Sequence, residues 1–399
     1  MNKVKIQEVL SRSIDTIYPS RQDLEKLLES GKKLRIYMGI DPTATYVHLG
    51  HATNYIILKR FHELGHKIIV VVGDFTAMIG DPSDKKSFRK RLTKKEVAEN
   101  LKTYKDQIGK ILDFSDKKNP IEFRFNSQWL SKLKFEDIIN IASHFTVQQM
   151  IERDTFEKRI KERKPLFVSE FFYPLMQGYD SVVLDADVEV GGTDQTFNML
   201  AGRSLVKSYL DKEKIVVSTT LLENPLTGEK LMSKSLGTGI ALNEKPNEMF
   251  GKAMSLPDEA IIQVFIDCTY LSMTQIDQYR GEMSEGKNPR DIKLILARKI
   301  VSQFHGQHEA EKAEANFIQI FQKKELPDEI REFKLDGTFN LPQLLVEVES
   351  ADSMSDARRL IKAGAVEVDG AKITDVSAKI STHKDMIIKV GKRRFAKIK

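Results

Sequence analysis

Two apolar stretches separated by one helical pattern constrain the fold of this chain more than any other feature. The first stretch covers residues 34–40 and the second covers residues 67–72. Between them a helix is predicted from Leu49 to Gly65, because apolar residues recur on one face at Ile57, Leu58, Phe61 and Leu64. A strand, a helix and a second strand make a β-α-β unit, whose parallel strands need a right-handed crossover. The sequence therefore predicts a parallel sheet covered by helices.

The same alternation continues along the chain. Further strands are predicted at residues 121–125, 188–190 and 215–218, and helices near residues 94–112, 135–150 and 194–210. This order is typical of a doubly wound, Rossmann-like α/β domain. We expect that domain to cover residues 1–245.

After Pro246 the strand signal disappears. Residues 246–335 show helical spacing and are predicted to form a helical domain, with a linker near residues 326–339. Residues 336–399 are expected to hold the end of that linker and a small α+β module whose core is residues 350–399. In this module Ser355 is expected to cap a helix that stops at Gly364, and Asp369-Gly370 signals a hairpin turn.

Charge is distributed unevenly. The whole chain has a net charge of +6, and residues 350–399 alone hold 12 basic and 6 acidic residues. A basic tail on a neutral body favours binding to a polyanion, because each neutralised phosphate releases counterions. A solvated surface explains the same charge equally well.

The remaining composition narrows the class of protein. The only cysteine, Cys268, excludes an internal disulfide and a thiolate metal cluster. The first ten residues lack the apolar core of a signal peptide, and the most apolar run, residues 68–72, is too short to span a bilayer. We therefore expect a cytoplasmic protein that does not bind a membrane.

The first chemical signal is the segment 41–51, DPTATYVHLGH, where a strand ends and a helix begins. A helix N-terminus offers free N–H donors and a positive dipole to a phosphate, and Gly50 leaves room for a flat base. His48 and His51 lie one turn apart and can donate hydrogen bonds to phosphate oxygens. Two surface histidines would show the same spacing. A metal site is less favoured, because no third ligand of the right type lies nearby in sequence, although the fold could bring one from elsewhere in the chain.

The second signal is the segment 230–235, KLMSKS, which lies between a turn at residues 224–228 and the glycines at 237 and 239. A loop with two lysines in this place can close over a triphosphate, although a solvated loop has the same composition. Neither common glycine-rich phosphate motif occurs in the chain.

Together these motifs resemble the HIGH and KMSKS signatures of the class I aminoacyl-tRNA synthetases. The strings VGDFTAMIGDPS at 72–83, YPLMQGYD at 173–180 and GGTDQ at 191–195 are similar to those of bacterial tyrosyl-tRNA synthetases. Residues 355–370 resemble an RNA-binding module that this family shares with a ribosomal protein. The likeness spans nearly the whole chain.

The resemblance implies a ligase that activates L-tyrosine with ATP and transfers it to the terminal ribose of tRNA-Tyr. The tyrosine carboxylate is itself the nucleophile, so the enzyme needs positioning and charge stabilisation rather than a covalent intermediate. Mg²⁺ would accompany ATP, and no protein-held metal is expected. The family also implies a homodimer, with no DNA among its partners.

The resemblance further implies roles for individual residues. The catalytic group comprises Thr43, His48, His51, Lys230 and Lys234. ATP would be bound by Gly39, Asp41, His48, Gly50, His51, Gly192, Asp194, Met232, Ser233 and Lys234. The tyrosine ammonium would meet Asp81, Tyr173 and Gln177, its carboxylate would meet Gln195, and its phenol would meet Tyr37 and Asp180. RNA would be bound by Arg358, Arg359 and Lys362.

Two departures from the family pattern leave open questions. Leu231 stands where the lid signature has its first lysine, and Lys230 precedes it, so the amine that fills this role is undecided. Asp74 stands where many relatives have glycine.

Two other functions compete with this interpretation. A tryptophanyl-tRNA synthetase would share the fold and the signatures, but Tyr37, Asp180 and the basic tail argue against it. A non-catalytic RNA-binding protein on the same fold would be expected to lack His48, His51 or Lys234.

Overall fold

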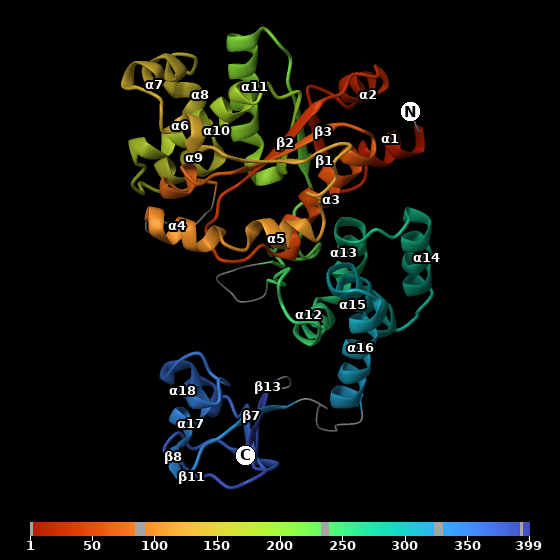
Figure 1. The fold of residues 1–399 in the computed structure, drawn as a ribbon, viewed down its shortest axis with the longest axis vertical. Coiled ribbons are helices and arrows are strands. Elements are labelled where there is room, and N and C mark those ends of the chain that lie inside the picture. The colour runs from red at the N-terminus through yellow and green to blue at the C-terminus, as the bar shows by residue number, and fades with distance from the viewer. Residues whose placement is uncertain (1–2, 84–91, 233–238, 323–329, 392–393) are drawn as a thin grey trace. The chain divides into compact units, whose positions relative to one another are not determined.

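A computed structural model of the 399-residue chain describes residues 3–83, 92–232, 239–322, 330–391 and 394–399. The chain forms two compact units, Met1–Gln307 and His308–Lys399 (Figure 1). Among the described residues, no helix has the length and apolarity needed to cross a bilayer. The predicted boundaries at residues 245 and 335 stay predictions.

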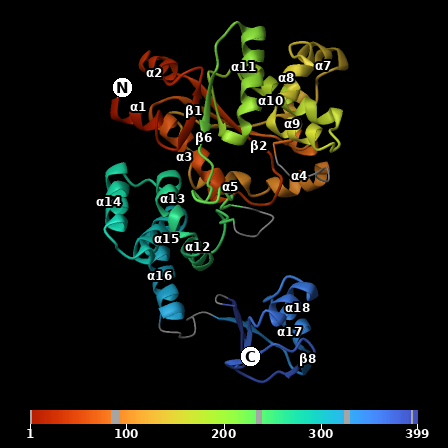
Figure 2. The same ribbon diagram turned by 180° about the vertical axis from the view of Figure 1, so that it is seen from behind.

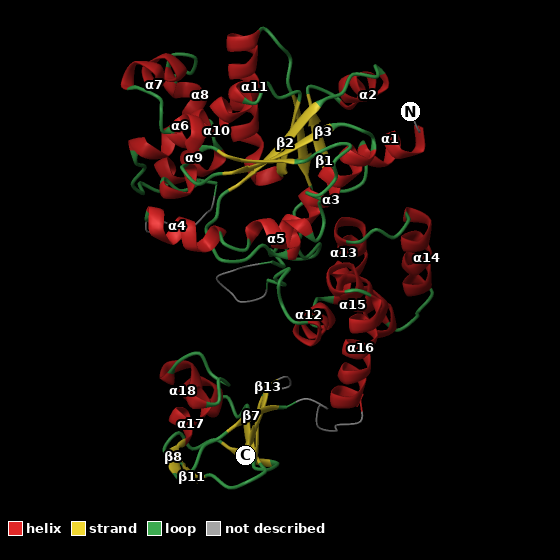
Figure 3. Ribbon diagram, viewed as in Figure 1, coloured by secondary structure: helices red, strands yellow, loops and turns green. Residues whose placement is uncertain are grey.

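A six-stranded sheet forms the centre of the first unit (Figure 3). Its strands follow the order β1-β6-β5-β2-β3-β4, and all neighbours are parallel except β1 and β6. The doubly wound parallel sheet predicted from the sequence is confirmed. The strands are β1 (Ile14–Tyr18), β2 (Arg35–Ile40), β3 (Lys67–Val72), β4 (Glu122–Phe125), β5 (Val188–Gly192) and β6 (Ile215–Thr219).

Helices cover both faces of this sheet, with α10 and α11 on one side and α1 and α3 on the other (Figures 1 and 2). This cover explains why the strands β5 and β6 are buried along their whole length. The helices of the first unit are α1 (Lys3–Val9), α2 (Arg21–Glu29), α3 (Leu49–Glu63), α4 (Lys94–Leu101), α5 (Tyr104–Gly109), α6 (Ser127–Leu130), α7 (Phe135–Ala142), α8 (Val147–Ile151), α9 (Asp154–Lys161), α10 (Val168–Val183), α11 (Thr196–Leu210), α12 (Pro246–Met254), α13 (Ile261–Cys268), α14 (Met273–Ser284) and α15 (Pro289–His305), with 3-10 turns at η1 (Thr76–Met78), η2 (Thr193–Gln195) and η3 (Asp258–Ala260).

Several elements differ from the sequence prediction. The helix expected near residues 94–112 is two helices, α4 and α5, and the one expected at 135–150 is also two, α7 and α8. Thr146 begins α8 with its own capping box, in which its side chain accepts from the Gln149 N–H. Strand β1 has no counterpart in the prediction. It is an edge strand that pairs antiparallel with β6, and no predicted helix or glycine turn next to it in the sequence marks it as a strand.

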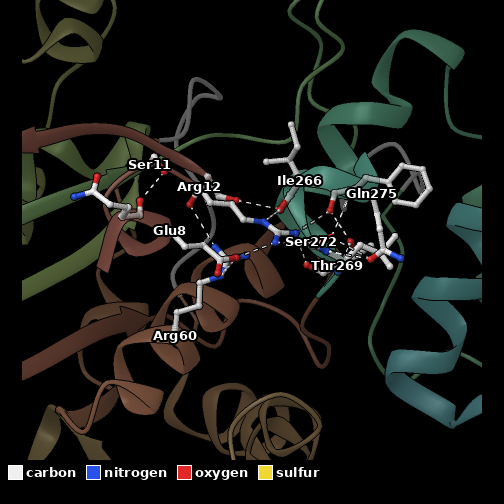
Figure 4. A network of polar contacts seen from close by, with 12 residues as sticks. Glu8, Ser11, Arg12, Arg60, Ile266, Thr269, Ser272 and Gln275 are labelled. Carbon is white, nitrogen blue, oxygen red and sulfur yellow. Dashed lines mark hydrogen bonds and ion pairs between the residues drawn. The ribbon is translucent and has the colours of Figure 1, made fainter. Parts of the chain in front are cut away.

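Arg12 joins the N-terminal segment to the helical segment that follows α12 (Figure 4). Its guanidinium is buried and donates to the carbonyl oxygens of Ile266 at 3.0 Å, Leu271 at 2.7 Å and Thr269 at 2.8 Å. Glu8 balances its charge at 3.0 Å. The last carbonyls of a helix have no intrahelical partner and carry negative partial charge, so Arg12 serves as the C-terminal cap of α13.

Replacing Arg12 with methionine should lower the free energy of unfolding by about 3–5 kcal/mol, because the carbonyls of a buried helix end lose their donors. Urea unfolding of the parent and the variant measures this loss. Arg280 is the matched control, since its ion pair with Asp277 is half-exposed and its replacement should cost about 0.5 kcal/mol or less. Equal losses in the two variants would contradict the capping role of Arg12.

In its described residues, the second unit holds a five-stranded sheet, a two-stranded sheet, one long helix and two short helices. Its hairpin is as predicted: β9 and β10 pair antiparallel through Asp369 and Gly370, both with positive φ, as a two-residue turn of this kind requires. The cap of α18 is Ser353, whose side chain accepts from the Asp356 N–H, and the predicted cap Ser355 lies inside the helix. The elements are α16 (Gln307–Gln322), β7 (Arg331–Phe333), β8 (Thr338–Asn340), α17 (Leu341–Glu347), α18 (Met354–Lys362), β9 (Val366–Val368), β10 (Ala371–Ile373), β11 (Lys379–Ser381), β12 (Ile387–Val390) and β13 (Arg394–Ile398).

The stretch expected as a linker contains two of these strands. β7 pairs parallel with β13 at the C-terminal end of the chain, and β8 pairs with β11. Three-residue strands carry too short an alternation to be recognised from sequence. The core of this unit is a cluster of buried apolar side chains from Leu341 to Ile398.

Candidate active site

The candidate site residues gather at the carboxyl edge of the large sheet. Tyr37 and Gly39 lie in β2, Asp41 follows it, and Gly192 ends the neighbouring strand β5. The chain leaves β2 toward β3 on one side and leaves β5 toward β6 on the other. Open α/β sheets bind ligands at such a reversal of strand order.

The histidines of the HLGH motif stand at the first turn of α3. His48 is the N-cap, its backbone N–H donates to His51 Nδ1 at 3.2 Å, and the two rings stack with centroids 3.7 Å apart. A Cβ on Gly50 would lie 3.2 Å from the His48 ring. Glycine at this position therefore keeps the His48 ring in its place.

Side chains of α4 and α5 hold the loop that leads to this motif. Asn100 donates to the Pro42 carbonyl at 2.8 Å, and Tyr104 donates to the Ala44 carbonyl at 2.9 Å. Gln107 is buried, and its amide oxygen accepts from the Val47 N–H at 2.7 Å. These bonds fix the loop that carries Thr43, which is partly buried.

Asp41 connects β2 with α10. It accepts from the Thr76 hydroxyl at 2.7 Å and from the Tyr173 hydroxyl at 2.9 Å. Burial raises the pKa of Asp41 to about 7, and these two hydrogen bonds act in the opposite direction. A carboxyl group with this pKa changes its charge near neutral pH.

This pKa predicts a pH-dependent stability. A carboxyl whose pKa is higher in the folded than in the unfolded state lowers the free energy of unfolding as pH rises from about 4 to about 7. Asp41→Asn removes this titrating group. Relative to that of the parent, the free energy of unfolding of the variant should therefore rise by about 1–3 kcal/mol between pH 5 and pH 8. Urea unfolding at both pH values measures the change, with the exposed Asp106→Asn as control. A constant difference between the Asp41 variant and its parent would contradict the prediction.

A second carboxylate, Asp81, lies three residues after η1. It accepts from the Gln195 amide at 2.6 Å and from the Ser83 hydroxyl at 2.6 Å. The buried guanidinium of Arg153 is 3.4 Å away. The structure thus brings together Asp81 and Gln195, although 114 positions separate them in the sequence.

Tyr37 and Asp180 are both buried, with 1% and 4% of their surface exposed. Asp180 accepts from the Trp129 indole N–H at 2.7 Å and from the Asn126 amide at 3.3 Å. Burial raises the pKa of Asp180 well above its ordinary value, and these two bonds oppose the shift. The Tyr37 hydroxyl lies 2.6 Å from Ser181 Oγ.

Gln177 lies one turn before Ser181 on α10. Its amide nitrogen donates to Glu189 Oε1 at 3.1 Å. A carboxylate only accepts hydrogen bonds, so the nitrogen of this amide must face Glu189 and its oxygen must face away from it.

At the C-terminal end of β5, Gly192 is buried, and a Cβ there would lie 2.8 Å from Asp194 Oδ1. Asp194 Oδ2 is 3.3 Å from Lys230 Nζ. Burial raises the pKa of Asp194, and Lys230 lowers it.

The residues that follow Lys230 belong to the second motif. Leu231 and Met232 are 9% and 7% exposed, so a lysine in place of Leu231 would have to bury its ammonium group. Ser233 and Lys234 lie outside the described residues.

Three further expectations concern other parts of the chain. Arg358, Arg359 and Lys362 are exposed on α18. Asp74 accepts from the Ser127 backbone N–H at 2.9 Å and from its hydroxyl at 2.6 Å, so it anchors the start of α6. Across the described ranges, no three His, Cys, Asp or Glu side chains are grouped to hold a metal ion.

Sequence reasoning missed several side chains that contact the site. They come from separate elements, and short-range spacing carries no signal for them. The one available signal is that Asn126 directly follows a strand and so lies at the same sheet edge as Asp41. The missed residues are Thr76, Asn126, Trp129, Arg153, Ser181, Glu189 and Lys214.

Comparison with known proteins identifies the family of the chain. A family described as "tRNA synthetases class I (W and Y)" matches residues 29–322, and "Tyrosine--tRNA ligase SYY-like C-terminal domain" matches residues 322–398. The tyrosine–tRNA ligase of Carboxydothermus hydrogenoformans is 48% identical over 98% of this chain and 97% of its own length. That of Thermotoga maritima is 43% identical over 98% of this chain and 96% of its own length.

Solved structures share the fold. A C-terminally truncated mitochondrial tyrosyl-tRNA synthetase of Aspergillus nidulans superposes with a TM-score of 0.67 at 22% identity, covering 79% of this chain and 93% of its own. The Archaeoglobus fulgidus enzyme complexed with L-tyrosine gives a TM-score of 0.60 at 22% identity, covering 79% of this chain and 100% of its own. The tryptophan alternative is not favoured, because the tyrosine-specific C-terminal family and the full-length relatives agree. The chain belongs to the tyrosine–tRNA ligase family of the class I tRNA synthetases.

Proposed function

We propose that this chain activates L-tyrosine at the edge of the sheet formed by β2 and β5 and then transfers it to tRNA-Tyr. The observation that carries the proposal is the burial of both Tyr37 and Asp180, whose hydroxyl and carboxylate would meet the phenol group of the substrate. Both groups have protein partners, but each keeps a hydrogen-bonding position that those partners do not fill. Leaving a buried position of this kind unfilled costs about 1–3 kcal/mol, so an amino acid without the phenol hydroxyl is rejected.

The phenol end of the substrate fixes where its ammonium and carboxylate groups lie in this proposal. Asp81, Tyr173 and the oxygen of Gln177 receive the ammonium group, and Gln195 lies beside the carboxylate. Asp81 and Gln195 already touch, at 2.6 Å, which supports a shared site for the two charged groups of the amino acid. The Tyr173 hydroxyl is held by Asp41 at 2.9 Å and so has a defined direction.

ATP lies across the start of α3 in this proposal. The first turn of α3 offers N–H groups to phosphate, and His48, His51 and Thr43 donate to phosphate oxygens as charge develops. Gly39, Asp41 and Gly50 border the nucleotide, and Gly192 with Asp194 receives adenosine and its ribose. Met232, Ser233 and Lys234 belong to the lid over the pyrophosphate. Mg²⁺ would accompany ATP and would neutralise part of the charge of its phosphates.

Pyrophosphate exchange with each of the twenty amino acids tests the assignment. Exchange stimulated by tyrosine alone is the expected result. Stimulation by tryptophan would overturn the assignment of Tyr37 and Asp180, and exchange with no amino acid would favour a non-catalytic RNA-binding protein. The same chain is proposed to work in the cytoplasm, where its buried Cys268 stays a free thiol.

The C-terminal unit is proposed to bind tRNA through α18. Arg358, Arg359 and Lys362 are exposed, and each can neutralise one phosphate. Replacing all three by glutamate should weaken tRNA charging about tenfold or more at physiological salt and leave pyrophosphate exchange with tyrosine unchanged. Charging assays at two salt concentrations measure the effect, and Lys379→Glu on β11 is a control of the same charge type. An equal fall in exchange and charging would show that α18 supports the catalytic unit instead.

We further propose that two copies of the chain pair through α7, α8 and the start of α10. Of the thirteen large apolar side chains exposed in the described chain, seven lie between residues 135 and 183. They include Phe135 at 77%, Val168 at 72% and Val147 at 66% exposed, a concentration typical of an interface. Sedimentation equilibrium of the full chain tests this: a mass of two chains supports it, and a single chain at micromolar concentration contradicts it.

A further inference from the structure

A charged network lies behind the tyrosine pocket and has no part in the activity described so far. Lys214 directly precedes β6 and is fully buried, at 0% exposure, and its ammonium group contacts Oε2 of Glu189, which is 1% exposed. Removing two charges from water is costly, and an apolar pair of the same volume is often as stable or more so. The pair therefore calls for an explanation beyond stability.

The contacts of this pair lead to two residues of the pocket. Glu189 Oε1 accepts from the Gln177 amide at 3.1 Å. Lys214 Nζ donates to Ser181 Oγ at 2.8 Å, and Ser181 Oγ lies 2.6 Å from the Tyr37 hydroxyl. One ion pair is thus linked to both Gln177 and Tyr37.

The direction of each hydrogen bond follows from the chemistry of its end groups. An ammonium group has donors only, so Ser181 accepts from Lys214. Ser181 then has one proton to donate, either to Tyr37 at 2.6 Å or to Glu189 Oε2 at 3.3 Å. The shorter distance is that of a good O–H···O bond, so Ser181 donates to Tyr37. The Tyr37 hydroxyl then keeps its own proton to donate, and Glu189, which also meets this hydroxyl, is the acceptor with which the phenol oxygen of a bound tyrosine would compete.

The space for this network depends on Gly202 in α11. A Cβ at Gly202 would lie 2.6 Å from both Lys214 Nζ and Ser181 Oγ, and 3.3 Å from Glu189 Oε2. Real Cβ atoms essentially never come within 3.0 Å of such neighbours. The absence of a side chain at Gly202 is therefore a condition for the contact between the three polar groups.

We propose that the Lys214–Glu189 pair is a positioning element for tyrosine recognition, acting through Ser181 and Gln177. It directs the Tyr37 hydroxyl to donate a hydrogen bond to the phenol oxygen of the substrate. The phenol hydroxyl of the substrate in turn donates a hydrogen bond to Asp180. It also directs the oxygen of Gln177 toward the substrate ammonium group. The inference rests on the proposed roles of Tyr37 and Gln177. Lys214 touches no substrate atom in this scheme and is a positioning residue.

Ser181→Ala is the sharpest test, because it removes one oxygen and leaves the ion pair intact. It should lower kcat/KM for tyrosine in pyrophosphate exchange about tenfold, leave that for phenylalanine unchanged and leave KM for ATP unchanged. In a Tyr37→Phe background the same change should have no further effect, because Ser181 acts through the Tyr37 hydroxyl. Ser350→Ala removes a buried serine hydroxyl from the C-terminal unit and should change none of these values.

Removing both charges together tests the ion pair itself. The double variant Lys214→Met with Glu189→Gln leaves no unpaired buried charge, and circular dichroism checks its fold. It should lower the preference for tyrosine over phenylalanine at least as much as Ser181→Ala does.

The outcomes separate this inference from the function on which it rests. An unchanged tyrosine-to-phenylalanine ratio in Ser181→Ala, or a full effect of that change in the Tyr37→Phe background, overturns the relay. If Tyr37→Phe itself leaves the ratio unchanged, the assignment of the phenol pocket fails first. Should the double variant keep the parent ratio while Ser181→Ala loses it, Ser181 positions Tyr37 without the ion pair, and the proposal for Lys214 and Glu189 is wrong.

Discussion

Asp180→Asn should reduce kcat/KM for tyrosine activation by about 10²–10³-fold, because the change removes a buried acceptor of a charge-assisted hydrogen bond. The amide keeps the size of the carboxylate and can still accept from Trp129, which is 2.7 Å away. It also places an NH₂ group next to the Asn126 amide or the substrate hydroxyl, where both sides would be donors. Binding of ATP should be unaffected, since the change lies at the phenol end.

Pyrophosphate exchange over a range of tyrosine and ATP concentrations measures this effect. Asp267→Asn is the matched control, because Asp267 is also fully buried and burial also raises its pKa, but it lies in α13 and bonds with Gln263 and Thr220. We expect the control to lose stability and keep its kinetic preference for tyrosine. Parent-like kinetics for Asp180→Asn would remove Asp180 from the pocket.

Lys234→Ala should slow tyrosine activation by about 10²–10³-fold with little change in tyrosine KM, because a cation that meets the leaving pyrophosphate acts mainly in the transition state. This prediction rests on the sequence, since Lys234 lies outside the described residues. Rapid-quench measurement of adenylate formation separates the chemical step from binding.

Lys230→Ala is the informative partner of this experiment. In the structure the Lys230 ammonium group lies 3.3 Å from Asp194, and half of the Lys230 side chain is exposed. We therefore expect Lys230→Ala to change ATP KM by less than about tenfold and to leave the chemical step near the parent rate. A loss as large as that of Lys234→Ala would show instead that Lys230 replaces the lysine missing at position 231.

Local patterns predicted the elements of the sheet closely. The strands β2, β3 and β4 agree with the predicted segments to within one residue at either end, and Gly65 follows α3 with positive φ as expected. Such features depend on neighbouring residues: apolar runs, capping side chains and glycine in left-handed conformations. The family motifs supplied the candidate site positions, and both the membership of the site and the roles of its residues stay predictions.

Contacts across long sequence separations could not be predicted in this way. Arg12 caps a helix that ends more than 250 positions later, and Tyr37 meets Ser181 across 144 positions. The role of Asp74 became clear only from its bond to Ser127, 53 positions away. None of these pairs has a period or spacing that a single sequence can reveal.

The sequence by itself thus determined the doubly wound sheet, the helical segment after it, the hairpin near the C-terminus and the family to which the chain is similar. The tertiary structure alone decided which buried polar groups form hydrogen bonds with one another, notably Lys214, Glu189 and Ser181. The physical reason is that strand and helix formation depends on side-chain patterns a few residues long, whereas a buried polar group needs whichever partner the folded chain brings within hydrogen-bond distance.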